Sequence, residues 1–183
     1  MGDAAYEIEV RSSHSHRLQS DHEPEISNLV PAMYPAPLND LIELFEHLPE
    51  QERRENLIVM ADSAKKQEPR EGEKFDLEDV RKDEECTDTV GMFLRAEDGD
   101  RAHFAVTLGP LVQTLTKAMT SILCRGLNGA KLQEVLEVPA DFVPRIVGAE
   151  LVRLRSQTVY YVLGRMKTAV KMLLDRRRAA QAA

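Results

Sequence analysis

The chain has 183 residues, of which 43% are hydrophobic and 30% charged, and its formal net charge is −7. This composition is typical of a soluble domain with a substantial core. The negative charge excludes a general nucleic-acid-binding protein, because such proteins carry a basic excess. No apolar run approaches the ~20 residues that span a membrane, and the first residues lack a secretory signal pattern. Since two cysteines give no disulfide framework, we expect a cytoplasmic protein with free thiols.

Residues 1–36 are expected to form a disordered extension. They are rich in serine, histidine and proline, and such a segment cannot bury enough apolar surface to offset the entropy of ordering. The histidines of this segment, His14, His16 and His22, could bind a metal ion. Solvated tail histidines are the simpler interpretation.

Two helices are predicted next, beginning near Leu38. Apolar residues recur at helical spacing up to Leu48, and Asn39 is expected to cap the start of this first helix. Pro49 ends the first helix and opens the second, because proline fits only the first turn of a helix. Residues 65–85 are strongly charged and are predicted to be one long loop.

A β-hairpin is predicted over residues 90–106. Apolar side chains alternate along both of its strands, and Gly99 can adopt the positive φ that the acidic turn requires. A helix that starts at Gly109-Pro110 follows, with Gly126 and Asn128-Gly129 as its stop, and then come short helices and a long final helix. We therefore expect an α+β fold in which a small antiparallel sheet has helices packed on one side.

The predicted domain spans residues 37–178, and residues 179–183 are expected to be a flexible C-terminus. Charge is distributed unevenly along this domain. Residues 43–86 hold fifteen acids and eight bases, whereas residues 151–178 hold eight lysines or arginines and one acid. A basic helix face is usually a solvated surface, and the alternative is that it docks an acidic partner.

Cys86 is the strongest candidate for chemistry. It lies between an acidic, turn-prone stretch and the first predicted strand, where a thiol is accessible to another molecule. A lone cysteine is often a small buried residue instead, but the polar neighbours argue against burial. Because like charges disfavour ionisation, these acids are expected to keep the thiol pKa at or above ~8.5. Cys124, within an apolar helix, is expected to pack in the core.

Other kinds of site have weaker support in the sequence. Two distant cysteines do not supply the four close ligands of a structural zinc or iron–sulfur site, so we expect no resident metal or cofactor. A pairing of His103 with Cys86 across the hairpin remains an open alternative. No Ser-His-Asp order, phosphate-binding glycine loop or HExxH helix is present.

From Leu38 to about Val170, the chain resembles the SufE-type cysteine desulfuration proteins. That family has two opening helices and a loop ending in a Gly-Cys-x-Ser-x-Val-Trp-like signature. A hairpin with an Asp-Gly turn and a Phe follows, and then a long helix with a Gly near its end and a Glu-Ile-Leu run. The corresponding residues here are Cys86-Thr87-Asp88-Thr89-Val90, Asp98-Gly99, Phe104, Gly126 and Glu134-Val135-Leu136.

The chain also departs from the family pattern at several positions. Glu85 stands where Gly is usual, Asp88 where Ser is common and Gly91 where Trp is usual. A Ser-Asp pair before the long helix is replaced by Leu108-Gly109. The C-terminal Leu-Ser-Pro-Ser-Arg motif is missing, and its place is taken by Arg153-Leu154-Arg155-Ser156-Gln157-Thr158. We expect Arg153 and Arg155 to contribute to partner docking.

The resemblance implies that Cys86 carries a persulfide. A protein of this kind accepts sulfur from a PLP-dependent cysteine desulfurase of the SufS type, and an iron–sulfur scaffold receives it. It stimulates the desulfurase and is not a stand-alone enzyme, and no cofactor, nucleic acid or membrane is implied. Two alternatives stay open, namely a desulfurase-binding adaptor without sulfur transfer and an iron–sulfur scaffold of related fold. Two cysteines are few for such a scaffold.

Overall fold

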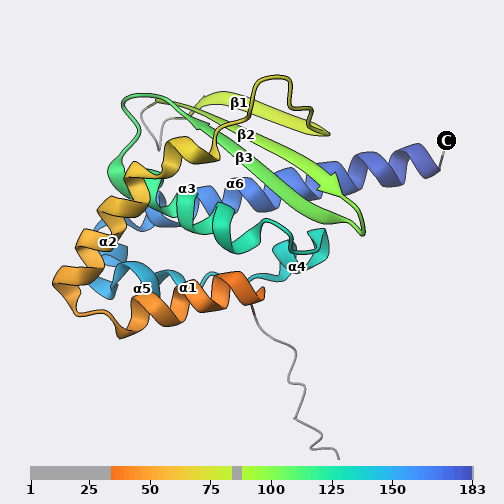
Figure 1. Cartoon of the computed structure of the whole chain (residues 1–183). Helices are drawn as coiled ribbons and strands as arrows, with labels where there is room; N and C mark the ends of the chain where they lie inside the picture. Colours follow the sequence, from red (N-terminus) through yellow and green to blue (C-terminus); the bar gives the residue numbers. More distant parts are fainter. Residues whose placement is uncertain (1–33, 84–87, 183) are drawn as a thin grey trace, which may run out of the picture. The chain divides into compact units, whose positions relative to one another are not determined.

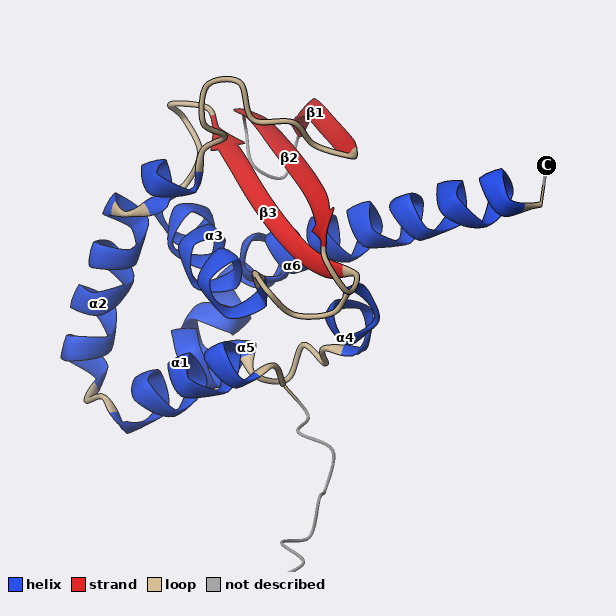
Figure 2. Ribbon diagram, turned by 45° about the vertical axis from the view of Figure 1, so that its right-hand side comes forward, coloured by secondary structure: helices blue, strands red, loops and turns tan. Residues whose placement is uncertain are grey.

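The computed structural model describes residues 34–83 and 88–182. Three antiparallel strands form one sheet in the order β1-β2-β3, and the helices lie against one of its faces (Figure 1, Figure 2). This arrangement confirms the predicted α+β class. The elements are α1 (Ala36–His47), α2 (Glu50–Asp62), the 3-10 helix η1 (Ala64–Gln67), β1 (Leu77–Asp83), β2 (Asp88–Glu97), β3 (Arg101–Leu108), α3 (Thr114–Leu127), α4 (Leu132–Glu137), α5 (Val143–Val147) and α6 (Ala149–Gln181).

β2 and β3 form the predicted hairpin. Leu94 pairs with Phe104 and Met92 with Val106, and all four side chains are buried in the core beneath the sheet. Gly99 adopts a φ of +73° in the turn, a conformation that glycine reaches without steric cost. The period-two alternation of apolar residues therefore identified both strands and their common buried face.

The long loop predicted over residues 65–85 contains a strand, so this prediction was wrong. β1 runs from Leu77 to Asp83 and pairs antiparallel with β2. It is an edge strand, in which Leu77 enters the core while Glu78 and Lys82 are exposed to solvent. The apolar alternation that identifies a half-buried strand is therefore missing, and charges on an edge strand are typical because they discourage pairing with other chains.

Pro49 separates α1 from α2 as predicted, but α1 begins earlier than expected. Its N-cap position is Pro35, and Pro37 lies in its first turn. Proline suits these positions because its φ is already helical and no N–H is needed there. Asn39 is therefore not the N-cap, and its Nδ2 donates a hydrogen bond to Oε1 of Glu43 at 2.6 Å.

α3 packs against α1, α2, α6 and β3 at the centre of the helical layer, and it differs from the prediction at its start. It begins at Thr114 and not at Pro110, so Leu111, expected in its apolar stripe, is 72% exposed in the connection from β3. The helix ends at Leu127 with Asn128 as its C-cap, which confirms the predicted stop at Asn128-Gly129, and Gly126 lies inside its last turn. A Cβ at position 126 would lie 2.9 Å from the Cβ of Leu38 on α1, so the glycine allows α1 and α3 to approach closely.

α6 packs against β1, β2 and α3, and its helical backbone is interrupted at Arg155, where φ is −140° and ψ is 34°. Along the part of the chain that the structure describes, no helix is long and apolar enough to cross a membrane. The side chains predicted to face the core are all buried, namely Val159, Val162, Leu163, Met166, Val170 and Leu173.

The two ends of the folded domain differ from the expected boundaries. α6 continues to Gln181, beyond the expected domain end at residue 178. Tyr34, which falls in the segment expected to be disordered, is buried against Phe142. Most of that segment, including the three tail histidines, lies outside the described residues.

Candidate functional site

The predicted site residue Cys86 lies outside the described residues, but the strands on both sides of it are described. β1 ends at Asp83 and β2 begins at Asp88, and these two residues pair directly in the antiparallel register. Residues 84–87 therefore connect two neighbouring strand ends. The surroundings of these ends form the described part of the candidate site.

Asp88 holds the start of β2 against the connection between β3 and α3. Its Oδ2 accepts a hydrogen bond from the Leu111 N–H at 2.8 Å, and its Oδ1 accepts one from the Thr89 N–H at 2.7 Å. The Gly109 N–H donates to the carbonyl of Thr89 at 2.9 Å. Because such donors favour the charged carboxylate, the bond from Leu111, followed by that from Thr89, lowers the pKa of Asp88.

The Asp88 carboxylate requires glycine at position 109. A Cβ at this position would lie 2.3 Å from Cγ of Asp88, well inside van der Waals contact. Any side chain there would push the carboxylate away from the Leu111 N–H. Asp88 and Gly109 therefore act as a pair that fixes this end of the sheet.

We expect the amide proton of Leu111 to report the titration of Asp88. The folded pKa of this carboxyl is lowered from 3.8, so its stabilising contribution is complete above pH 3.8 and is lost as the pH falls through the folded value. In an NMR pH titration, the amide shifts of Leu111 and Thr89 should move together with a midpoint below 3.8. Asp88→Asn is the control and should abolish the transition. A midpoint at or above 3.8 would contradict the hydrogen-bonding account.

A buried arginine on α6 holds β1, the strand that ends just before residues 84–87. Nη2 of Arg165 donates to the backbone carbonyl and to Oδ2 of Asp79 on β1, both at 2.9 Å, and Nη1 donates to the Tyr161 hydroxyl at 2.6 Å. A buried cation is stable only when it is paired in this way. Arg165 was not among the residues predicted to be buried, although its spacing of four residues from Tyr161 and Ala169 places it on the buried face of the helix.

Cys124 lies in α3 and is completely buried. Burial raises the pKa of its thiol to about 12, so the reactive thiolate is not formed near neutral pH. The predicted core role of Cys124 is therefore confirmed. Within residues 34–83 and 88–182, no group of His, Cys, Asp and Glu side chains is arranged to hold a metal ion.

His103 lies on β3, beside the end of β2 that is far from Asp88. It pairs with Arg95 of β2, and Arg95 is seven residues beyond Asp88 on that strand. Because each strand residue adds ~3.4 Å, the two positions are far apart along the sheet. Nε2 of His103 lies 3.1 Å from Oε1 of Glu73, on the loop before β1. The register therefore gives no support to the alternative in which His103 pairs with Cys86.

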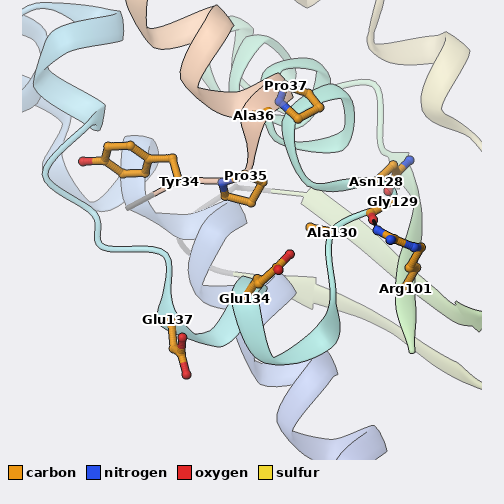
Figure 3. A pocket seen from close by; sticks show the side chains of 10 residues that line it. All are labelled: Tyr34, Pro35, Ala36, Pro37, Arg101, Asn128, Gly129, Ala130, Glu134 and Glu137. Carbon is orange, nitrogen blue, oxygen red and sulfur yellow. Dashed lines mark hydrogen bonds between the residues drawn. The ribbon is translucent and has the colours of Figure 1, made fainter. Parts of the chain in front are cut away.

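A cavity of about 650 Å³ opens at the end of the sheet where β3 begins (Figure 3). Arg101 lies beside Gly129 and donates to its carbonyl at 2.6 Å, while Glu134 on α4 accepts the Lys131 N–H at 2.9 Å. These polar side chains form hydrogen bonds with nearby backbone groups. None of the ten described residues that line it is a cysteine, so this cavity offers no thiol for sulfur transfer.

The sequence model of the SufE family, described as an Fe-S metabolism associated domain, matches residues 39–170. The chain belongs to the SufE family. This SufE-family protein is therefore associated with iron–sulfur metabolism, and the matched range includes Cys86. No curated protein matches the chain.

The SufE-family protein is also similar to a solved structure, the solution structure of a hypothetical protein from Thermus thermophilus. The two share a TM-score of 0.58 and 23% sequence identity, and the similarity covers 78% of this chain and 98% of the other. At this level of identity, the similarity shows a common fold and supports the α+β architecture described above.

Two departures from the SufE pattern are linked in space. Asp88 stands where Ser is common, and Gly109 stands at the second position of a Ser-Asp pair. A Cβ at position 109 would lie 2.3 Å from Cγ of Asp88. The Asp88 carboxylate therefore occupies the space that a side chain at position 109 would need.

A third departure, Gly91, is explained by its neighbours in the sheet. A Cβ at position 91 would lie 2.3 Å from Oγ1 of Thr107, 2.9 Å from Cε2 of Phe93 and 3.1 Å from Cγ2 of Val80. Val80 and Thr107 are its partners on the two adjacent strands. The space that the usual tryptophan would need is therefore occupied by side chains on both sides.

Arg153 and Arg155, the expected docking residues of this SufE-family protein, are both exposed in the first part of α6. Arg155 lines a groove that α6 forms with α2 and α3, and Arg153 does not. Neither arginine forms an ion pair with another residue that the structure describes. Their role in docking stays a prediction.

Proposed function

We propose that this SufE-family protein accepts persulfide sulfur on Cys86 from a PLP-dependent cysteine desulfurase of the SufS type. It then passes the sulfur to an iron–sulfur scaffold. The observation that carries the proposal is the family match, because it spans Cys86. The other thiol is unsuited to the role, since Cys124 is buried and its pKa is raised to about 12.

The proposed transfer is an exchange between thiols in which no net oxidation occurs. The Cys86 thiol loses its proton, and the thiolate attacks the outer sulfur of the persulfide on the desulfurase cysteine. The S–S bond of the donor breaks, and the desulfurase thiolate leaves and takes up a proton. Cys86 then carries the persulfide, and a second exchange with an acceptor thiol releases the sulfur.

The anchoring of the two strands beside Cys86 supports this proposal. Asp88 bonds β2 to Leu111, and Arg165 bonds β1 to α6 through Asp79. The strand ends on both sides of residues 84–87 are therefore each held by a hydrogen bond to a neighbouring element. The exposed Leu111 side chain lies on the same connection that Asp88 contacts and offers an apolar contact to a partner.

A desulfurase-binding adaptor without sulfur transfer is the second candidate. One observation favours it, namely the acidic residue Glu85 directly before Cys86 in place of the glycine usual in the family. A neighbouring negative charge disfavours the thiolate that transfer requires. In this alternative the protein binds and stimulates the desulfurase, and Cys86 has no chemical role.

The proposal predicts that the chain gains one sulfur atom, about 32 Da, after incubation with a SufS-type desulfurase and cysteine. Intact-mass spectrometry followed by peptide mapping should find the added sulfur on Cys86, and a reductant should remove it. The unreacted protein incubated without cysteine is the control. Added sulfur found only on Cys124 would contradict the assignment.

A further inference from the structure

A groove of about 470 Å³ lies between α2, the start of α3 and the first part of α6. Leu57 and Ala118 are buried in it, whereas Ile58 and Leu154 along it are 54% and 63% exposed. Leu115, half-buried, also lines it. Exposed apolar side chains gathered around a depression are typical of interaction surfaces.

The groove adjoins the Asp88 end of the sheet. Gln113 and Thr114, which line it, follow Leu111 within three residues, and the Leu111 N–H is the one that Asp88 binds. Leu111 is itself 72% exposed. The segment that is hydrogen-bonded to the start of β2 at Leu111 therefore continues, within three residues, into the wall of the groove.

The charge of the groove suits an acidic occupant. Among its described lining residues, Glu150 is the one acid, and it lies 3.6 Å from Arg54, which also pairs with Glu50. Arg155 lines the groove and Arg153 lies two residues before it, and neither is neutralised by a described acid. Cationic side chains in a protein with a net charge of −7 provide complementarity to a negative partner.

We propose that this groove binds an amphipathic helix of the sulfur-donating desulfurase. The helix would place leucine-like side chains against Ile58, Leu115 and Leu154, and acidic side chains near Arg153 and Arg155. A groove between helices matches the spacing of such anchors at i, i+3 or i+4. A second copy of this chain fits less well, because a symmetric contact would bring the same arginines together. The inference rests on the proposed function, since it takes the desulfurase as the partner.

Two single substitutions test the groove without disturbing the core. Ile58→Asp and Leu154→Asp place a charge on exposed apolar side chains, and each should weaken binding to a purified SufS-type desulfurase by about 10-fold or more, as expected for an apolar anchor in a pocket. Val59→Asp is the matched control, because Val59 adjoins Ile58 on α2 and is 62% exposed but does not line the groove. Isothermal titration calorimetry should give this control an affinity within about twofold of the wild type.

The charge of the occupant is tested separately. Arg155→Glu should weaken binding by about 10-fold at low ionic strength and should flatten the dependence of affinity on salt. A photoreactive benzophenone side chain at position 154 should cross-link to an amphipathic, acidic helix of the desulfurase. Cross-linking to a basic segment or to a second copy of this chain would overturn the proposed occupant.

The measurements separate failure of this inference from failure of the proposed function. If the wild type gains sulfur on Cys86 while both groove variants bind as tightly as Val59→Asp, the groove inference fails and the transfer function stands. If the groove variants bind weakly but the wild type gains no sulfur, the transfer function fails and the docking surface stands. If the wild type does not bind the desulfurase, both are overturned.

Discussion

Replacing Cys86 by serine is expected to abolish sulfur transfer completely and to remove the stimulation of the desulfurase that depends on it. A serine hydroxyl is much less acidic than a thiol and forms no persulfide, so the exchange step has no acceptor atom. The rate of alanine formation from cysteine by a SufS-type desulfurase, measured with and without the protein, checks this outcome. Transfer of ³⁵S from labelled cysteine to the protein provides a direct second readout.

The matched control for this experiment is Cys124→Ala. Cys124 is fully buried in α3, so its loss should cost stability of about 1 kcal/mol but leave sulfur acceptance near the wild-type value. If Cys86→Ser stimulated the desulfurase as well as the wild type does, the adaptor alternative would be correct and the acceptor proposal would be wrong. The two single variants therefore decide between transfer and binding alone.

Truncating Tyr34 to alanine is expected to lower the free energy of unfolding by about 3 kcal/mol, as for other buried aromatic residues. Tyr34 is only 6% exposed, and its ring packs edge-to-face on Phe142 with centroids 5.8 Å apart. Its hydroxyl donates to Oδ1 of Asp141 at 2.5 Å, and burial, followed by this contact, raises the pKa of Tyr34. Urea denaturation monitored by circular dichroism measures the change.

Tyr34→Phe and two truncations locate the origin of this effect. Tyr34→Phe keeps the ring and loses the hydroxyl, so it should cost about 1 kcal/mol. Deleting residues 1–33 should change stability by less than ~1 kcal/mol, because that segment lacks the apolar periodicity of a packed element. Deleting residues 1–36 also removes Tyr34 and should resemble Tyr34→Ala. Equal stability of the two truncated proteins would show that the ring contributes little.

The sequence predicted those parts of the fold in which one face is apolar and the other polar. The strands β2 and β3 alternate with a period of two, and the buried residues of α6 recur at helical spacing, so both were identified correctly. β1 was missed because it is an edge strand that places Leu77 in the core while charged residues face solvent. Its strand conformation is set by pairing with β2, which local sequence patterns do not report.

The candidate site depends even more on contacts between distant parts of the chain. The bond from the Leu111 N–H to Asp88 and the need for glycine at 109 join segments about twenty residues apart, and neither segment alone indicates the other. Arg165 was overlooked because a basic helix suggested a solvated face. Its burial follows from the helical period, but its bonds to Asp79 depend on the placement of β1.

The side chains packed around Gly91 limit which residues can replace this glycine. The Cβ of a tryptophan introduced at 91 alone would lie 2.3 Å from Oγ1 of Thr107 and 2.9 Å from Cε2 of Phe93, so the substitution requires these side chains to shift or become smaller. Overpacking of this kind forces strain on the surrounding backbone. We therefore expect Gly91→Trp to be tolerated better together with a smaller side chain at position 107 than alone. Substitutions at positions 91, 93 and 107 are expected to be coupled, so the effect of each should be measured in the background of the others.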